Sequence, residues 1–184
     1  GTVATGPMAD LQLRLSGKRV DELLALGGLR TSATGAFSMN TRLRMTPQPR
    51  YAFDEIDAQI GESKIAGRLV VDASAKRTTF EAKLSSPTLR QIDIGGGAAK
   101  EVVDESRHAT QESRAPKWLA PLRRYDARVD LEAERLFAAG EWLGPVRLKA
   151  RLEAGRLQVD ALEIRSQGGS LVARGSIDAP PESS

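Results

Sequence analysis

The chain has 184 residues, of which 40% are hydrophobic, 28% are charged and only 4% are aromatic. It contains no cysteine, which excludes disulfide scaffolds, Cys-ligated zinc and thiol catalysis. The net charge of +3 is small and spread along the chain, so nucleic-acid binding, which favours clustered basic residues interleaved with aromatics, is not expected.

The first half of the chain alternates apolar and polar residues with a period of two, as strands do when one face is buried and the other is solvated. Turn signals at 46–49, 61–63 and 73–76 predict short links between antiparallel neighbours. Apolar residues at helical spacing, ended by Gly27, predict one short amphipathic helix over about 19–27. The strands expected in this half lie around 11–15, 37–45, 56–60, 65–71 and 80–84.

Residues 95–117 combine a glycine triplet with a charged run that has no apolar periodicity, which predicts a flexible linker. The only histidine, His108, falls in this linker and is expected to be solvated, not a metal ligand or a catalytic base. Weaker turns are expected around 87–92 and 118–122.

The second half alternates more regularly than the first, with turn signals at 154–155 and 167–169. The apolar phase changes between Val159 and Leu162, which predicts a β-bulge. The strands expected here lie around 125–133, 146–152, 157–164 and 171–177, which makes nine in all.

The segments 56–69 and 164–177 can be aligned without a gap, so that Gly61 coincides with Gly169 and Gly67 with Gly175. This similarity predicts two related β-repeats that stack on each other. The predicted organisation is a first repeat over 1–94, a linker over 95–117, a second repeat over 118–179 and a tail over 180–184.

Candidate chemistry is sparse, and no catalytic residue, metal site or cofactor is expected. Glu55 and Asp57 share one face of a predicted strand opposite apolar neighbours, which is typical of a solvated face and not of paired catalytic carboxylates. The glycines at 95–97 lack the Lys-Ser/Thr pair of a phosphate loop. Trp118 and Trp142 suit either edge packing, which is favoured, or contact with a lipid interface.

The apolar face of an antiparallel sheet must be covered by a second sheet, a helix or a ligand. The alternation alone favours a closed sandwich. No apolar run reaches the roughly 20 residues that a membrane-spanning helix needs. The chain also lacks a signal-peptide pattern at its start, which suggests a piece of a longer protein.

Several segments, in order along the chain, resemble the AsmA family of bacterial envelope proteins. Residues 11–26 resemble the strand-then-helix entry of the family, and 33–38 its following strand. Gly61–Leu69 resembles the hairpin pattern G-[DE]-S-x-[IL]-x-G-x-[LI]. The segment 79–94 resembles the strand and turn that come next, and 155–157 and 168–171 resemble the last two strands of a family unit.

The resemblance implies a mainly β fold, an antiparallel meander that forms a curved, groove-like sheet with one short helix. It also implies a periplasmic segment of a protein anchored in the inner membrane, with the anchor outside this stretch. Related proteins, including TamB-like ones, form long β-grooves and are implicated in lipid traffic and outer-membrane integrity. The expected function is therefore a non-catalytic groove module that binds phospholipid or another acyl-chain lipid.

The alternative is a structural scaffold that binds envelope proteins, or adjacent repeats of the same chain, through its sheet edges. For the groove, the candidate lipid-facing residues are Ile65, Leu69, Val71, Leu131, Val146, Leu148, Leu157, Val159 and Leu171.

Overall fold

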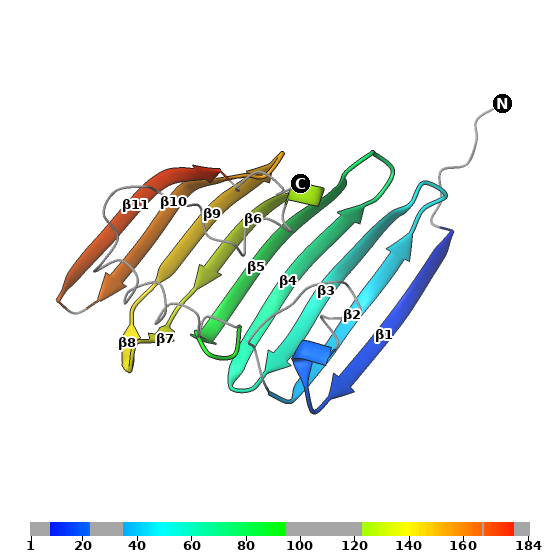
Figure 1. Cartoon of the computed structure of the whole chain (residues 1–184). Coiled ribbons are helices and arrows are strands. Elements are labelled where there is room, and N and C mark those ends of the chain that lie inside the picture. Colours follow the sequence, from blue (N-terminus) through cyan, green and yellow to red (C-terminus); the bar gives the residue numbers. More distant parts are fainter. Residues whose placement is uncertain (1–7, 23–34, 95–122, 167, 179–184) are drawn as a thin grey trace.

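The computed structural model describes residues 8–22, 35–94, 123–166 and 168–178, and within these ranges the protein is almost entirely β-strand (Figure 1). The eleven strands are β1 (Ala9–Gly17), β2 (Phe37–Met45), β3 (Arg50–Ile60), β4 (Ser63–Asp72), β5 (Thr78–Arg90), β6 (Tyr125–Ala133), β7 (Leu136–Ala138), β8 (Glu141–Leu143), β9 (Val146–Glu153), β10 (Arg156–Ser166) and β11 (Gly169–Asp178). The mainly β fold predicted from the alternation is confirmed.

Nine of these strands form one continuous open sheet in the order β1-β2-β3-β4-β5-β6-β9-β10-β11. They correspond to the nine strands expected from the sequence. The short strands β7 and β8 lie off this path as a hairpin in which β7 pairs with β5 and β8. The alternation does not predict this hairpin, because two strands of three residues are too short to show a period.

The expected antiparallel meander is correct for every neighbouring pair along this path except one. β5 and β6 run parallel, from Thr78 opposite Tyr125 to Ser86 opposite Ala133. A parallel pair needs the chain to return along the full length of a strand before it pairs, which a tight turn cannot provide. The residues from 91 to 124 separate these two strands, and this long separation permits a parallel arrangement that the short turns between β2, β3, β4 and β5 forbid.

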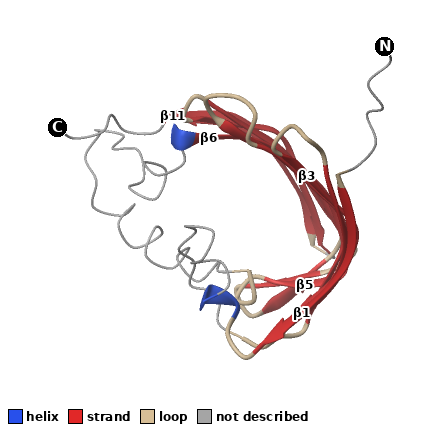
Figure 2. Ribbon diagram, turned by 90° about the vertical axis from the view of Figure 1, so that its right-hand side faces the viewer, coloured by secondary structure: helices blue, strands red, loops and turns tan. Residues whose placement is uncertain are grey.

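Three bulges bend the sheet. The register shifts by one residue in β3 between Phe53 and Ile56, in β5 between Ser85 and Thr88, and in β10 between Val159 and Leu162. The last of these is the bulge that the phase change predicted. An extra residue in one strand increases its twist and bends it, and Figure 2 shows the strands curving into a trough with a C-shaped section.

The bulge in β3 explains why Thr41, a polar residue, lies on the otherwise apolar face of β2. Glu55 adopts a positive φ of 53° there, and the register of the ladder is interrupted next to Asp54. The hydroxyl of Thr41, which is fully buried, donates a hydrogen bond of 2.8 Å to the Asp54 carbonyl. Thr41 therefore satisfies a backbone acceptor beside the bulge, which a valine could not do.

Little of the predicted helix falls within the described residues. Residues 20–22 are helical, Val20 is buried, and its backbone N–H donates to the Gly35 carbonyl. The remainder of the helix expected over 19–27, the linker over 95–117 with His108, the turn that includes Trp118 and the tail over 180–184 lie outside the described ranges.

The two hairpins that suggested a repeat have the same topology but different registers. The β3–β4 hairpin closes between Ile60 and Ser63, and Gly67 lies opposite Ile56. The β10–β11 hairpin closes between Ser166 and Gly169, two positions earlier than the gapless alignment requires. The alignment is therefore not a residue-by-residue structural correspondence, although a shift of two preserves which face each side chain occupies.

Replacing Ala154 with Asn should stabilise the fold. Ala154 and Gly155 form the two-residue β9–β10 turn with φ values of 53° and 83°, a left-handed conformation that costs alanine about 1 kcal/mol. Because Asn tolerates this conformation, we expect the free energy of unfolding to rise by about 0.5–1 kcal/mol in thermal or urea denaturation. Ala75→Asn, in an exposed turn where φ is not positive, is the control and should bring no such gain.

Candidate functional site

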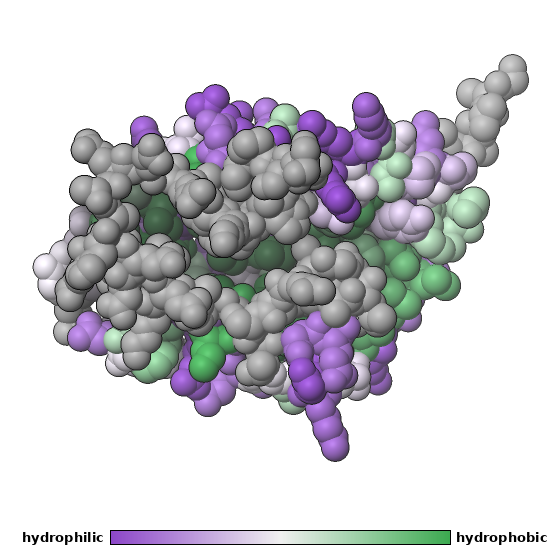
Figure 3. Space-filling view, viewed as in Figure 1, coloured by the Kyte–Doolittle hydropathy of each residue, from purple (hydrophilic) through white to green (hydrophobic). Residues whose placement is uncertain are grey.

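The candidate site is the concave apolar face of the sheet, which we call the trough face. Register places its side chains in rows that cross the strands: Leu131 of β6 lies opposite Leu84 of β5 and Leu148 of β9, and Leu148 lies opposite Leu162 of β10. Figure 3 looks into this side and shows hydrophobic residues in the hollow and hydrophilic residues along both rims. The face comprises Leu11, Leu13, Leu15, Phe37, Met39, Leu43, Met45, Tyr51, Phe53, Ile56, Ala58, Ile65, Leu69, Val71, Phe80, Ala82, Leu84, Ala127, Val129, Leu131, Val146, Leu148, Ala150, Leu152, Leu157, Val159, Leu162, Ile164, Leu171, Ala173 and Ile177.

None of these trough-face residues carries a charge, whereas the opposite face is charged on almost every strand. Its charges form cross-strand ion pairs, among them Arg147 with Glu132 at 3.4 Å and Lys149 with Asp130 at 3.7 Å. Pairs this exposed contribute little stability individually. Their main effect is to keep the convex face hydrated and thereby to make the two faces of the sheet chemically opposite.

Asp10 and Asp160 are among the carboxylates of the charged face whose pKa values lie below the ordinary range. The pKa of Asp10 is lowered chiefly by its hydrogen bond from Arg42, and that of Asp160 by its hydrogen bond from Arg151. A carboxylate with a lowered pKa in the folded state stabilises the fold above its unfolded-state pKa, and this contribution disappears as pH falls through the folded-state pKa. The pairs of Asp10 with Arg42 and of Asp160 with Arg151 are therefore intact at neutral pH.

The trough face is only partly buried. Among the described residues the buried apolar side chains are Val20, Ile56, Ala58, Val70, Leu89, Ala133, Val146 and Leu152, and most other trough-face side chains are half-buried. All the described strands of the main path belong to one sheet, so no second sheet packs on this face within those ranges. The closed sandwich that the alternation alone favoured is wrong for this part of the chain.

The nine candidate lipid-facing residues all lie on the trough face. Ile65, Leu69 and Val71 come from β4, and the other six from β6, β9, β10 and β11. Leu171 is the most open, with 51% of its surface exposed. Whether these side chains contact lipid stays a prediction.

Val146 requires a correction. It is only 5% exposed and forms a buried cluster with Leu89 and Ala133 at one rim of the trough, against which Leu136 packs. Its side chain is therefore part of the core and not of the accessible surface. The strand that carries Leu136 was not predicted, which is why Val146 was expected to be open.

Other accessible trough-face residues were not among the candidates. Phe53 and Leu162 each lie beyond a bulge, where the alternation changes phase. Leu84 was recognised as a strand residue, but its position opposite Leu131 depends on the parallel pairing of β5 with β6. The phase change was the available signal for the first two. For Leu84 the alternation indicated the apolar face, and only its position beside Leu131 had no local signal.

A furrow of small side chains runs along the second half of the trough. In register across β5, β6, β9, β10 and β11 it contains Ala82, Val129, Ala150, Val159 and Gly175. Larger side chains flank it, including Leu131 and Leu148 on one side and Leu152 and Leu157 on the other. Five strands spaced about 4.8 Å apart give the furrow a length of about 19 Å, which exceeds the roughly 15 Å of one leaflet of a bilayer's hydrocarbon core.

One rim of the trough, where β4 begins and β5 ends, is fixed by a buried carboxylate. Asp93 is 7% exposed, and its Oδ2 accepts hydrogen bonds from the backbone N–H of Glu62 at 3.1 Å, the backbone N–H of Ser63 at 3.0 Å and the hydroxyl of Ser63 at 2.8 Å. The Ser63 hydroxyl oxygen in turn accepts from the backbone N–H of Arg90 at 2.8 Å. This network, the Asp93 clamp, ties the β3–β4 turn to the segment after β5.

The acidic residues considered for catalysis are engaged in structure or solvated. The carboxylate of Asp54 accepts ion-pair contacts from Arg44 at 2.5 Å and Arg68 at 2.8 Å, while Glu55 and Asp57 are exposed. Among the residues that the structure describes, no group of three or more His, Asp or Glu side chains could hold a metal ion. What the described arrangement offers is a surface for apolar contact.

Comparison with known proteins adds no family to this description. No family model, no curated protein and no solved structure matches the chain. The resemblance to the AsmA family therefore stays a prediction. Within the described ranges no helix is both long and apolar enough to cross a bilayer.

Proposed function

We propose that the trough holds the acyl chains of phospholipids, and that the chain is a non-catalytic periplasmic module of an AsmA-like protein that moves lipids between envelope membranes and thereby supports the outer membrane. The observation that carries this proposal is the trough face itself, which is uncharged, continuous over nine strands and half-exposed. A surface of that extent is unusual on a protein that has no apolar partner.

The physical basis is burial of apolar surface. Each methylene group of an acyl chain that leaves water contributes roughly 0.8 kcal/mol, and this contribution does not depend on direction. The furrow lets such a chain lie low between the rows of leucine side chains. Contacts of this kind favour acyl tails over polar molecules and require no bond chemistry, cofactor or metal.

The openness of the trough at both ends supports movement along it. The terminal strands of the sheet are β1 and β11, and neither has a neighbour on its outer side among the described residues. Within the described residues, the rows of trough-face side chains therefore continue as far as each of these edge strands. A lipid tail can change place along such a surface by exchanging equivalent apolar contacts.

A second candidate function is the scaffold, and the same edges favour it. The unpaired backbone groups of an edge strand are a template for adding another strand. β1 and β11 run in opposite directions, because the sheet has seven antiparallel pairs and one parallel pair between them. A strand from an envelope protein or from an adjacent repeat could thus continue the sheet at either edge.

Native mass spectrometry of the purified chain distinguishes the two functions. If the trough holds lipid, we expect a fraction of the protein to carry the added mass of a phospholipid, which extraction and fragmentation would identify. Lipid-free protein that instead retains a protein partner would favour the scaffold and count against the trough. Protein incubated with the same lipids after urea unfolding is the control for nonspecific adhesion.

A further inference from the structure

The β7–β8 hairpin is the one part of the described sheet that leaves the main path, and its two sides differ. Leu136 of β7 pairs with Leu143 of β8 and with Leu89 of β5. Leu136 packs on the buried cluster formed by Leu89, Ala133 and Val146 and so anchors the inward side of the hairpin. Because successive side chains of a strand point to opposite faces, Phe137 and Trp142 lie on the outward side.

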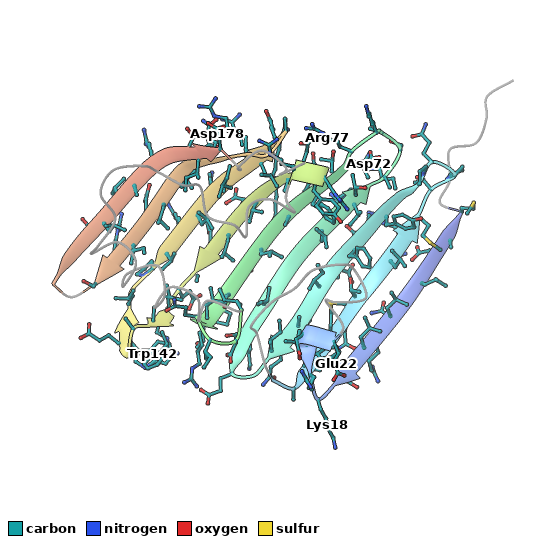
Figure 4. The ribbon with its side chains drawn as sticks, viewed as in Figure 1. Lys18, Glu22, Asp72, Arg77, Trp142 and Asp178 are labelled. Carbon is teal, nitrogen blue, oxygen red and sulfur yellow. The ribbon has the colours of Figure 1, made fainter. Side chains whose placement is uncertain are left out.

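The outward side carries an aromatic pair held between two guanidinium groups. The ring centroids of Phe137 and Trp142 are 5.1 Å apart. The guanidinium carbon of Arg90 lies 5.1 Å from the Phe137 ring centroid, and that of Arg135 lies 5.3 Å from the Trp142 ring centroid. These contacts fix the orientation of both rings. Trp142 is nevertheless 51% exposed and projects at the rim of the sheet (Figure 4).

A second exposed apolar residue lies in a turn that is bonded to this hairpin. Ile92 is 60% exposed in the turn that follows β5, and the backbone N–H of Gln91 donates to the Phe137 carbonyl at 3.0 Å, so this turn is attached to the hairpin. The hairpin and its attached turn thus expose Trp142 and Ile92, whereas the convex face of the main sheet exposes ion pairs. The core does not require this exposure, because the inward side alone packs on it.

The charges nearby indicate what kind of surface would fit. Arg90 is paired with Glu62, whereas Arg135 contacts the Thr88 hydroxyl and the Trp142 ring and has no carboxylate within ion-pair distance in the described part of the chain. An indole with a polar N–H, next to an aliphatic side chain and an uncompensated arginine, is the combination that prefers the interface of a bilayer. Glu141 is exposed at the same tip and opposes attraction to anions.

We propose that the outward side of the β7–β8 hairpin docks on the surface of a phospholipid bilayer that contains anionic headgroups. Trp142 and Ile92 enter the interfacial layer, and Arg135 contacts headgroup phosphates. Docking at this rim brings the open trough next to the bilayer from which a lipid would be taken. The purpose of docking rests on the proposed lipid function, but the docking itself is measured separately.

Tryptophan fluorescence of the full chain in a Trp118→Phe background tests this proposal, because Trp142 is then the only tryptophan. Vesicles of phosphatidylcholine mixed with phosphatidylglycerol should shift its emission to the blue, and brominated lipid should quench it. In vesicle sedimentation Trp142→Ser should weaken binding about tenfold. Arg135→Gln should weaken binding about fivefold on anionic vesicles only, and Glu141→Gln should strengthen it there.

The readouts separate docking from acyl-chain binding. Trp142→Ser and Arg135→Gln should leave uptake of a fluorescent fatty acid by the trough unchanged, since neither side chain belongs to the trough face. Vesicle binding that is equal for wild type and both variants, or an unshifted and unquenched Trp142 on bound protein, would overturn the docking proposal. Loss of fatty-acid uptake in a Leu148 variant that still binds vesicles leaves docking intact and locates the acyl site in the trough.

Discussion

Replacing Leu148 with Asp is expected to abolish binding of a fluorescent fatty acid while preserving the β-strand circular dichroism spectrum. Leu148 lies in the second half of the trough, between Leu131 of β6 and Leu162 of β10, and is half-buried. An acyl chain that covers this position would have to dehydrate a carboxylate without pairing it, which costs far more than the contact yields. Fluorescence titration at neutral pH measures the effect.

Two further variants make this result interpretable. Ser176→Asp adds the same charge on the charged face of β11, where the Ser176 hydroxyl already accepts a hydrogen bond from Arg156 at 3.3 Å, and should bind fatty acid like the wild type. Ala150→Phe adds no charge but fills the furrow, and it should weaken binding if the chain lies there. Wild-type affinity in folded Leu148→Asp protein would refute the trough as the acyl site.

Replacing Asp93 with Ala should lower the free energy of unfolding by about 3 kcal/mol. The change removes the acceptor of three hydrogen bonds and leaves the buried N–H and hydroxyl of Ser63 without that partner. Asp93→Asn should cost less, because an amide oxygen at the Oδ2 position can still accept. Urea denaturation followed by circular dichroism gives the comparison.

The neighbouring Glu62→Ala change is the matched control for the Asp93 clamp. Its carboxylate belongs to an exposed ion pair with Arg90, so its loss should change stability by less than about 1 kcal/mol. Ser63 and Asp93 share a hydrogen bond. The loss of unfolding free energy in the Ser63→Ala/Asp93→Ala double variant should therefore be smaller than the sum of the losses in the two single variants. Additive losses, or an Asp93→Ala protein as stable as the wild type, would show that the clamp does not hold this rim of the trough.

The alternation in the sequence was sufficient to predict the nine long strands and the face on which their aliphatic side chains lie. That prediction succeeds because a period of two directly reports the pleat, whatever the neighbours of a strand are. It also located the bulge in β10, since a bulge inverts the phase between Val159 and Leu162. The sequence contains the same inversion between Phe53 and Ile56, but there it cannot be distinguished from the start of a strand at Ile56.

Features that depend on contacts between distant segments could not be predicted in this way. The parallel pairing of β5 with β6 leaves no local pattern, and it decides that Leu84 lies beside Leu131. The burial of Val146 depends on Leu89, which is distant in the sequence, and on the short strand that carries Leu136. The Asp93 clamp joins residues about 30 positions apart and has no motif of its own.

The parallel pair at the centre of the sheet also has a kinetic consequence. Within β3-β4-β5 and within β9-β10-β11, neighbouring strands are joined by turns of only a few residues. β5 and β6, in contrast, can pair only after a loop of 34 intervening residues has closed. The entropy of closing that loop exceeds that of a four-residue turn by only about 2 kcal/mol, but this is enough to delay the step relative to local hairpin formation. The molecule should therefore assemble as two rapidly formed halves whose joining along one seam limits the overall folding rate.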